Sequence, residues 1–357
     1  MLGPALRDKH AGVDCRPGST NVFPRKNFAF PLKRKPLPTG SDQERAPHQR
    51  TPHSSLSLSG VPFVSHRLLA SLPLVRIALF VLVAATSVVQ AAEDNLVRLP
   101  DVVYDQPAGK PLHLDYVRPQ GEGPFPLVVC IHGGGWRQGS RTDYKDFQTN
   151  MAGMGVATAS VQYRFAPEAK FPAQLEDIRS ALKFVLADSD KFRADAKRVL
   201  WMGGSAGGHL ALLAGLEPSQ NHTTKLIVNV AGPTDLRTFK SLPSGDTVLK
   251  TYVSRNSSEL LEDLLGTPDR KAAIYATASP VTHLRAGAPR IVTCHGEKDD
   301  LVPIAQAEAL HEKLHELKAS ELLIRSKSGG HDFGSWETSE RTSALIKIVE
   351  EIKTAIQ

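Results

Sequence analysis

Apolar residues between positions 92 and 357 follow two alternating patterns. Some form short continuous runs of Val, Ile, Leu and Ala, as in strands buried on both faces of a sheet, and others recur at helical spacing. We predict strands over 112–117 (an edge strand), 127–131, 157–163, 198–202, 226–230, 291–294 and 322–325. We predict helices over 171–187, 304–317 and 342–356, and from the glycines of 203–208 through Ala214. This alternation indicates the α/β fold class, with a mostly parallel sheet covered by helices on both faces.

A glycine-rich segment lies between the predicted strand 198–202 and the helix that follows it. It reads Gly203-Gly204-Ser205-Ala206-Gly207, a G-x-S-x-G pattern. The glycines permit a sharp turn that leaves the Ser205 hydroxyl exposed, and the helix N-terminus adds N–H groups and positive potential for a developing oxyanion. Because catalytic groups collect at the carboxyl ends of parallel strands, Ser205 is the candidate nucleophile.

A second glycine-rich segment, His132-Gly133-Gly134-Gly135-Trp136, follows the predicted strand 127–131. Three consecutive glycines let the backbone approach a substrate and point N–H groups into a site. The alternative is a flexible loop whose Trp136 fills the core.

These segments together resemble the α/β-hydrolases of the hormone-sensitive-lipase-like esterase group, over about residues 95–355. Residues 163–168 (YRFAPE) and 171–173 (FPA) are similar to further signatures of that group. His209 stands where the lipase-like members usually have Asn, which resembles the branch of bacterial acetylxylan and feruloyl esterases (BD-FAE-like). The resemblance implies an α/β-hydrolase fold. Strand signals begin soon after residue 91, so we expect no large cap domain.

The resemblance also implies a carboxylate partner for the serine. Chain order in these enzymes is Ser, then Asp or Glu, then His. Residues 295–303 (HGEKDDLVP) resemble the family's H-G-x-x-D-x-x-V-P turn, which places Asp299 as the acid. Asp300 is the runner-up, and Asp235 is a more distant alternative.

A histidine that could act as the base lies on the loop after the strand 322–325. His331 is preceded by Gly329 and Gly330, and such a loop can reach over the sheet to the serine. We predict that His331 is catalytic, whereas His209 and His295 are structural.

The predicted function is hydrolysis of short-acyl carboxylic esters through a Ser-His-Asp triad and an acyl-enzyme. The amides of Gly134, Gly135 and Ala206 are the expected oxyanion donors. The resemblance implies a small ester or an acetylated carbohydrate, such as an acetylated plant polysaccharide, as substrate. No metal or cofactor is expected, because the triad mechanism needs none. The sequence also contains neither a P-loop nor a dinucleotide-binding fingerprint.

Two alternatives differ from this prediction. One is a serine peptidase of the prolyl-oligopeptidase type, but residues 92–357 leave no space for the propeller that admits peptides. The other is a non-catalytic hydrolase fold used for binding. Such scaffolds usually lose a triad member or the oxyanion glycines, and this sequence retains all of them.

The first ninety-one residues differ in composition from the rest. Residues 1–66 are rich in Pro, Arg, Lys, Ser and His without apolar periodicity, which indicates a disordered basic leader or a start codon assigned too far upstream. Residues 67–91 combine Arg67 and Arg76, a short apolar run and small residues before Ala92, the order of a secretory signal peptide. We therefore expect residues 92–357 to be exported to the periplasm or outside the cell. The apolar run is shorter than the roughly 20 residues that span a bilayer, so no stable membrane anchor is expected.

Charge and cysteine content exclude other classes of protein. The whole chain carries a net charge of +6, but residues 1–91 hold 12 Lys and Arg against 4 Asp and Glu, while residues 92–357 hold 31 against 33. Since the body is slightly acidic, we expect no nucleic-acid partner. Three cysteines are too few for a disulfide scaffold. Cys130 and Cys294 end different predicted strands that are not expected to be neighbours, so we predict two free thiols.

Overall fold

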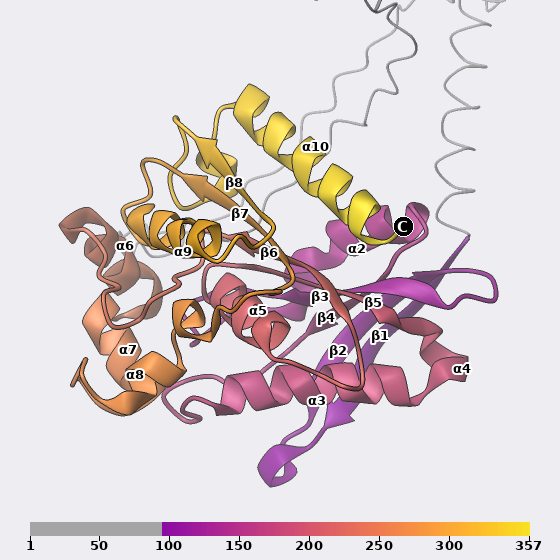
Figure 1. Ribbon diagram of the computed structural model, residues 1–357. Helices are drawn as coiled ribbons and strands as arrows, with labels where there is room; N and C mark the ends of the chain where they lie inside the picture. The colour runs from indigo at the N-terminus through magenta and orange to yellow at the C-terminus, as the bar shows by residue number, and fades with distance from the viewer. Residues whose placement is uncertain (1–94) are drawn as a thin grey trace, which may run out of the picture.

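The computed structural model describes residues 95–357, and the predicted leader (1–66) and signal peptide (67–91) lie outside this range. Its centre is an eight-stranded sheet with the order β1-β2-β4-β3-β5-β6-β7-β8 (Figure 1). The β1–β2 and β2–β4 pairs are antiparallel, and all other neighbouring strands are parallel. The strands are β1 (Leu96–Asp105), β2 (Leu112–Pro119), β3 (Phe125–Ile131), β4 (Ala157–Val161), β5 (Ala194–Gly204), β6 (Thr224–Val230), β7 (Arg290–Gly296) and β8 (Glu321–Ser326).

Helices cover both faces of this sheet, as predicted. α3 (Ala173–Ala187), α5 (Ala206–Leu216) and α9 (Ala305–Glu316) pack on one face, and α2 (Lys145–Gly153) and α10 (Thr338–Ala355) on the other (Figure 1). The remaining elements are α4 (Ser189–Phe192), α6 (Pro243–Val253), α7 (Ser257–Leu265), α8 (Ala273–Thr277) and the 3-10 helices η1 (Pro107–Gly109), η2 (Arg141–Tyr144), η3 (Pro280–His283) and η4 (Phe333–Ser335).

The continuous apolar runs are explained by this two-sided burial. In β3, Leu127, Val129 and Ile131 join the core beneath α3, α5 and α9, while Val128 and Cys130 pack beneath α2 and α10. A strand with both faces covered has no position that prefers a polar side chain, which is why its sequence lacks alternation.

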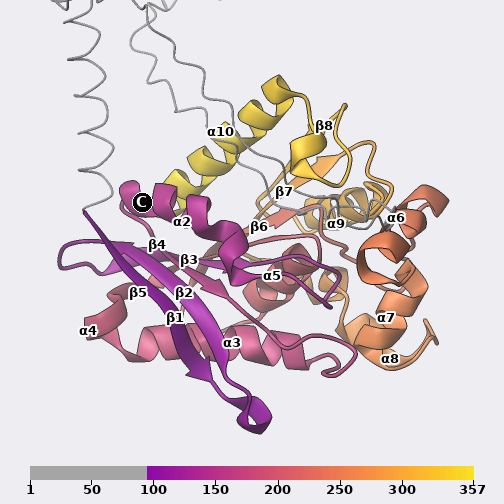
Figure 2. The same cartoon turned by 180° about the vertical axis from the view of Figure 1, so that it is seen from behind.

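The prediction that 112–117 forms an edge strand is wrong. β2 is the second strand, and β1 lies outside it at the sheet edge (Figure 2). Most side chains of β1 are exposed or half-buried, and its register with β2 shifts between Leu99 and Val102, where Pro100 and Asp101 intervene. These two residues break the apolar pattern, so the strand gives only a weak signal in the sequence.

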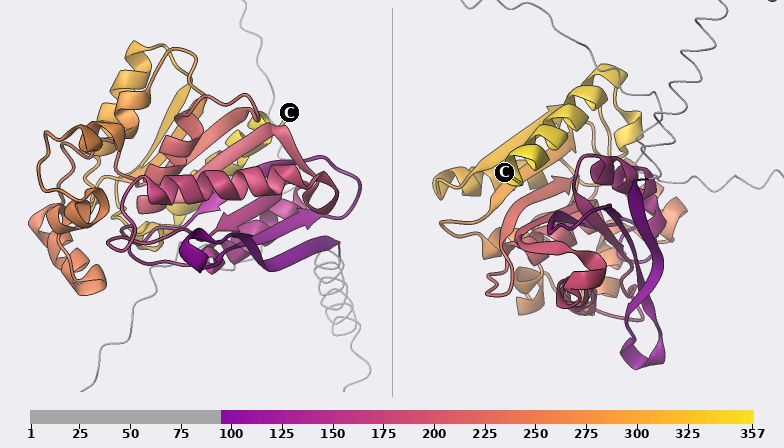
Figure 3. Two further views of the ribbon diagram at one scale, coloured as in Figure 1. Left: turned by 90° about the horizontal axis from the view of Figure 1, so that it is seen from below. Right: turned by 90° about the vertical axis from the view of Figure 1, so that its right-hand side faces the viewer.

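The segment between β6 and β7 adds helices beyond the layers that cover the sheet. α6, α7 and α8 gather at one end of the molecule (Figure 3), and α6 and α7 line a pocket together with residues that follow β3 and β5. Asn256 begins α7 with a capping box to Glu259, and Gly266 ends it in the left-handed conformation. Residues 260–265, which have the apolar pattern of a helix, lie within α7.

The two cysteines of the described range are unpaired, as predicted. Cys130 lies in β3 and Cys294 in β7, which are separated by two strands, and both side chains are buried. Among residues 95–357, no helix has both the length and the apolar character required to cross a membrane.

Candidate active site

Ser205 occupies the sharp turn between β5 and α5. Its backbone φ is +55°, a left-handed conformation that a non-glycine residue adopts only where its surroundings enforce it. The Ser205 amide donates to the Val230 carbonyl at 2.8 Å, and the Ser205 carbonyl accepts from the His209 amide at 3.1 Å. The turn is therefore held from both sides, by β6 and by the first turn of α5.

The glycines around Ser205 are required by close backbone contacts. A Cβ atom on Gly203 would lie 2.2 Å from the Gly207 carbonyl oxygen, and one on Gly207 would lie 2.0 Å from the Ile131 carbonyl oxygen. Neither position can hold a side chain unless the backbone moves. The G-x-S-x-G pattern thus reflects the packing of α5 against the end of β3.

The structure brings the three predicted triad residues together. His331 Nε2 lies 2.9 Å from Ser205 Oγ, and His331 Nδ1 lies 2.7 Å from Asp299 Oδ2. The serine follows β5, the aspartate follows β7 and the histidine follows β8, so all three project from the carboxyl edge of the sheet. This arrangement can move a proton from the hydroxyl to the imidazole.

Asp299 is a buried carboxylate with polar partners at both of its oxygens. Its Oδ1 accepts from the amides of Leu301 and Val302 at 3.0 and 2.9 Å, and its Oδ2 lies near His331 Nδ1 and, at 3.2 Å, near His295 Nε2. Burial alone would raise its pKa, but the charge and hydrogen bonds of His331 and His295 outweigh burial and hold the pKa of Asp299 below its ordinary range. The carboxylate therefore stays ionised.

The pKa of His331 is shifted in the opposite direction, upward. Burial favours its neutral form, but the nearby charge and hydrogen bond of Asp299, with further contributions from Asp332 and Asp300, raise its pKa above the ordinary histidine value. An imidazole with a raised pKa is a stronger base towards the serine hydroxyl, provided that it is neutral at the working pH.

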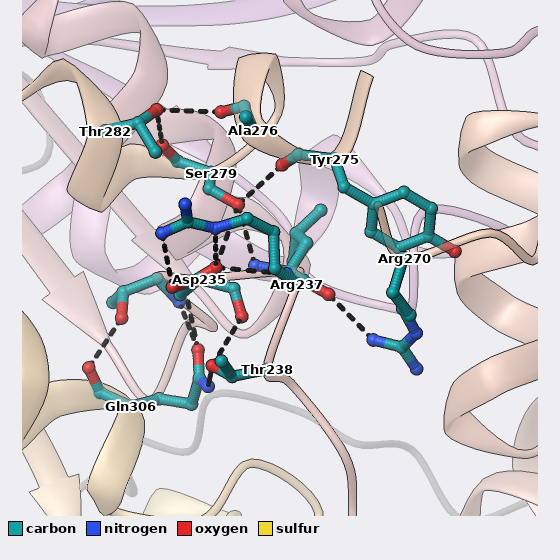
Figure 4. Close-up of polar contacts among 11 residues, drawn as sticks. Asp235, Arg237, Thr238, Arg270, Tyr275, Ala276, Ser279, Thr282 and Gln306 are labelled. Atoms are coloured by element: carbon teal, nitrogen blue, oxygen red, sulfur yellow. Dashed lines mark hydrogen bonds and ion pairs between the residues drawn. The ribbon is translucent and has the colours of Figure 1, made fainter. Parts of the chain in front are cut away.

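The two alternative carboxylates lie elsewhere. Asp300 accepts the Leu242 amide through its backbone carbonyl, and it is Asp299 that bonds the imidazole. Asp235 forms an ion pair with Arg237 and accepts a hydrogen bond from Ser279 Oγ at 3.3 Å (Figure 4). It thus belongs to the loop network at the end of the α6–α8 segment rather than to the triad.

The three predicted oxyanion donors line the same pocket as Ser205 and His331. Gly134 and Gly135 have φ values of +111° and +60°, and a Cβ on Gly134 would lie 2.1 Å from the Gln138 carbonyl oxygen. Within residues 95–357, the amides of Gly134, Gly135 and Ala206 donate to no acceptor. Such free N–H groups, one of them at the N-terminus of α5, are suited to an oxyanion.

The wall of this pocket is largely apolar and comes mostly from the segment after β6. α6 contributes Val248, Leu249, Tyr252 and Val253, and α7 contributes Leu260. α6 was not among the predicted helices, although apolar residues at 248, 249, 252 and 253 have helical spacing. The polar residues at the start of this segment made the helical spacing of its apolar residues less evident.

The two histidines predicted to be structural are both fully buried. His295 Nε2 lies 2.7 Å from the Val302 carbonyl and close to Asp299, so it supports the acid turn. His209 contacts Trp136 of the glycine loop. Among the described residues, no group of three or more His, Cys, Asp or Glu side chains could hold a metal ion.

Comparison with known families gives a match over residues 114–314 to the family model described as BD-FAE, which is more than half of the chain. The chain is 28% identical over 227 residues to "Esterase LipC" of Mycobacterium tuberculosis, with 59% of this chain and 53% of that protein covered. It is 30% identical over 227 residues to "Probable carboxylic ester hydrolase LipM" of the same organism, with 61% and 52% covered. The chain thus spans about half the length of these curated relatives.

Solved structures share the fold. One, described as "Bacterial Heroin Esterase", has a TM-score of 0.60 at 22% identity and covers 81% of this chain and 93% of that chain. Another, a "Truncated form of carbohydrate esterase from gut microbiota", has a TM-score of 0.57 at 20% identity and covers 72% and 96%. At these identities the likeness concerns the fold alone.

Proposed function

Because the chain belongs to the BD-FAE family of α/β-hydrolases, we propose that it is a serine carboxylic-ester hydrolase that acts on short-acyl esters. One observation carries the proposal: a hydroxyl, an imidazole and an ionised carboxylate are connected by contacts of 2.9 and 2.7 Å, beside free backbone amides. The curated relatives are named as an esterase and a probable carboxylic ester hydrolase, which supports the same class of reaction.

The acylation step uses each of these groups. Ser205 Oγ attacks the ester carbonyl carbon while His331 Nε2 accepts the hydroxyl proton. Asp299 keeps His331 in the Nδ1–H tautomer and stabilises the imidazolium. The tetrahedral oxyanion accepts hydrogen bonds from the oxyanion amides, and loss of one such donor typically costs about 3–4 kcal/mol. Collapse of the intermediate expels the alcohol, which takes the proton from His331.

Deacylation repeats the sequence with water. His331 accepts a proton from the water as it attacks the acyl-enzyme carbonyl, and the proton then returns to Ser205 Oγ when the carboxylic acid leaves. In this mechanism the acyl group contacts the apolar wall formed by α6 and α7. We propose an acetylated carbohydrate as the alcohol side, on the resemblance to acetylxylan and feruloyl esterases.

The direct test compares wild type with Ser205→Ala on a chromogenic acetyl ester, acetylated xylan and a feruloyl ester. We expect acetate release by wild type and its abolition in the variant, with an unchanged thermal midpoint because the hydroxyl contributes little packing. A serine-directed organophosphonate should label wild type only. Variant activity within about tenfold of wild type would remove Ser205 as the nucleophile, and cleavage of a proline-containing peptide in preference to esters would favour the peptidase alternative.

A further inference from the structure

His209 lies one helical turn after the nucleophile and has a partner on each ring nitrogen. Trp136 Nε1 lies 3.2 Å from His209 Nδ1, and the Ala278 carbonyl oxygen lies 2.7 Å from His209 Nε2. The two rings meet edge to face, with centroids 5.3 Å apart. All three residues are buried, and His209 is fully inaccessible to solvent.

These partners specify a single protonation state. An indole N–H only donates, so Nδ1 of His209 must be an unprotonated acceptor. A carbonyl oxygen only accepts, so Nε2 must carry the hydrogen. Burial further lowers the pKa of His209 to about 4, consistent with a neutral Nε2–H tautomer at neutral pH.

The two bonds connect three parts of the site. Trp136 follows the oxyanion loop directly, has a φ of +57° and lines the pocket. Its backbone carbonyl accepts the Ala166 amide at 2.9 Å, and at the opposite end its indole N–H has His209 Nδ1 as hydrogen-bond partner. Ala278 ends the α6–α8 segment.

Ser279, the residue after Ala278, connects the same segment to the loop after β6. Ser279 Oγ donates to the Tyr275 carbonyl at 2.6 Å and accepts the Leu236 amide at 2.9 Å, close to Asp235 (Figure 4). The end of the α6–α8 segment is thereby fixed to the loop after β6, which supplies Pro233 to the pocket.

We propose that His209 is a positioning residue with two separable functions. Through Nδ1 it orients Trp136 and with it the oxyanion loop, which affects the rate of the chemical step. Through Nε2 it holds the end of the segment that lines the acyl pocket, which affects substrate binding. This inference rests on the proposed esterase function.

Two substitutions, each of which mimics one ring nitrogen of His209, separate the bonds. In His209→Asn the amide oxygen occupies the position of Nδ1 and keeps the acceptor for Trp136, but the side chain is too short to reach Ala278. In His209→Gln the amide nitrogen takes the place of Nε2 and keeps the bond to Ala278, but Trp136 loses its acceptor. On an acetyl ester, we expect kcat of the Gln variant to fall at least about tenfold below that of the Asn variant. The Asn variant should show the larger rise in KM.

Trp136→Phe tests the Nδ1 bond from its other end, and remains informative if His209→Gln fails to fold. It should lower kcat about as much as His209→Gln. The double variant Trp136→Phe/His209→Gln should lose little more than either single variant, because both substitutions remove the same bond.

Trp201→Phe is the matched control. It also removes a buried indole hydrogen bond, to Thr224 Oγ1 at 3.2 Å, but this bond lies in the body of β5. It should lower the thermal midpoint and leave kcat unchanged.

A readout without turnover separates this inference from the proposed function. Histidine ¹⁵N spectra of the full chain should show His209 as an Nε2–H tautomer that does not titrate near the ordinary histidine pKa of roughly 6.5. The NMR signal of the Trp136 indole proton should shift in His209→Gln and much less in His209→Asn.

Three results would each overturn the proposal. They are equal kcat in the two His209 variants, multiplicative losses of kcat in the double variant, and titration of His209 near an ordinary histidine pKa of about 6.5. If wild type cleaves no ester, the proposed function fails while the spectra still decide the tautomer.

Discussion

At the scale of single residues, two adjacent aspartates differ in what their carboxylates contact. Asp299 Oδ2 lies 2.7 Å from His331 Nδ1, while Asp300 contributes only a more distant charge. We expect Asp299→Asn to lower kcat on the order of 10⁴-fold, because an amide there favours the wrong imidazole tautomer. Asp300→Asn should retain most of the activity. Initial-rate kinetics on an acetyl ester compare the two variants. A greater loss of kcat in Asp300→Asn than in Asp299→Asn would mean that Asp300 is the triad acid.

The pH dependence follows from the raised pKa of His331. Its protonated imidazole cannot accept the serine proton, so kcat/KM should fall as pH drops through this pKa. Asp300 helps to raise the pKa of His331, so Asp300→Asn should move this acid limb to lower pH with its plateau retained. Glu350→Gln removes the same charge from the exposed side of α10, and should leave the limb in place. A shift to higher pH in Asp300→Asn would contradict the electrostatic assignment.

At the scale of elements, the packing of α5 against β3 gives a stability prediction. A Cβ on Gly207 would lie 2.0 Å from the Ile131 carbonyl oxygen, so Gly207→Ala should lower the thermal midpoint sharply and abolish turnover. Gly153 ends α2, and a Cβ there would meet no atom within 4 Å, so Gly153→Ala should be neutral or stabilise by up to about 1 kcal/mol. Thermal unfolding of both variants measures the difference.

The α6–α7 segment lines the pocket that we propose holds the acyl chain. Leu260 and Val253 lie 3.4 and 3.8 Å from the position of a Cβ on Gly135, so they close the pocket near the oxyanion loop. We therefore expect higher kcat/KM for acetyl and propionyl esters than for octanoyl esters. Each methylene that gains apolar contact is worth about 0.8 kcal/mol, so Leu260→Ala should raise the relative rate for longer chains.

A series of acyl lengths measures this preference. Ile346→Ala on α10 is the control, since it removes a similar aliphatic side chain that is 44% exposed and does not line the pocket. A wild-type maximum at eight or more carbons would show that α6 and α7 enclose a longer channel than these contacts indicate.

At the scale of the whole molecule, the sheet, its covering helices and the predicted triad all lie within residues 95–357. A chain beginning at Ala92 should therefore fold and keep the kcat and thermal midpoint of the full chain. If export and cleavage follow the predicted signal, N-terminal sequencing of the secreted protein should read Ala92-Glu93-Asp94. Loss of activity in the shortened chain would show that residues before 92 contribute to the enzyme.

Local sequence was sufficient for the strands buried on both faces and for the turn at Ser205. Continuous apolar runs need no knowledge of the neighbouring strand, because burial on both faces favours apolar residues at successive positions. The role of Gly203 and Gly207 can likewise be inferred from the sequence, because a backbone turn this tight excludes side chains wherever it occurs. The resemblance to the family's acid turn then favoured Asp299 over Asp300 and Asp235, and the glycines before His331 indicated the base; the structure brings Asp299 and His331 together with Ser205.

Contacts between distant segments decided the rest. The edge position of β1, the contribution of α6 to the pocket and the two bonds of His209 each depend on residues far apart in the chain. A histidine in a helix has the same local pattern whether its ring is exposed or bonded on both nitrogens. The partners Trp136 and Ala278 lie 73 and 69 residues away on either side, and only the folded chain brings their donor and acceptor to one ring.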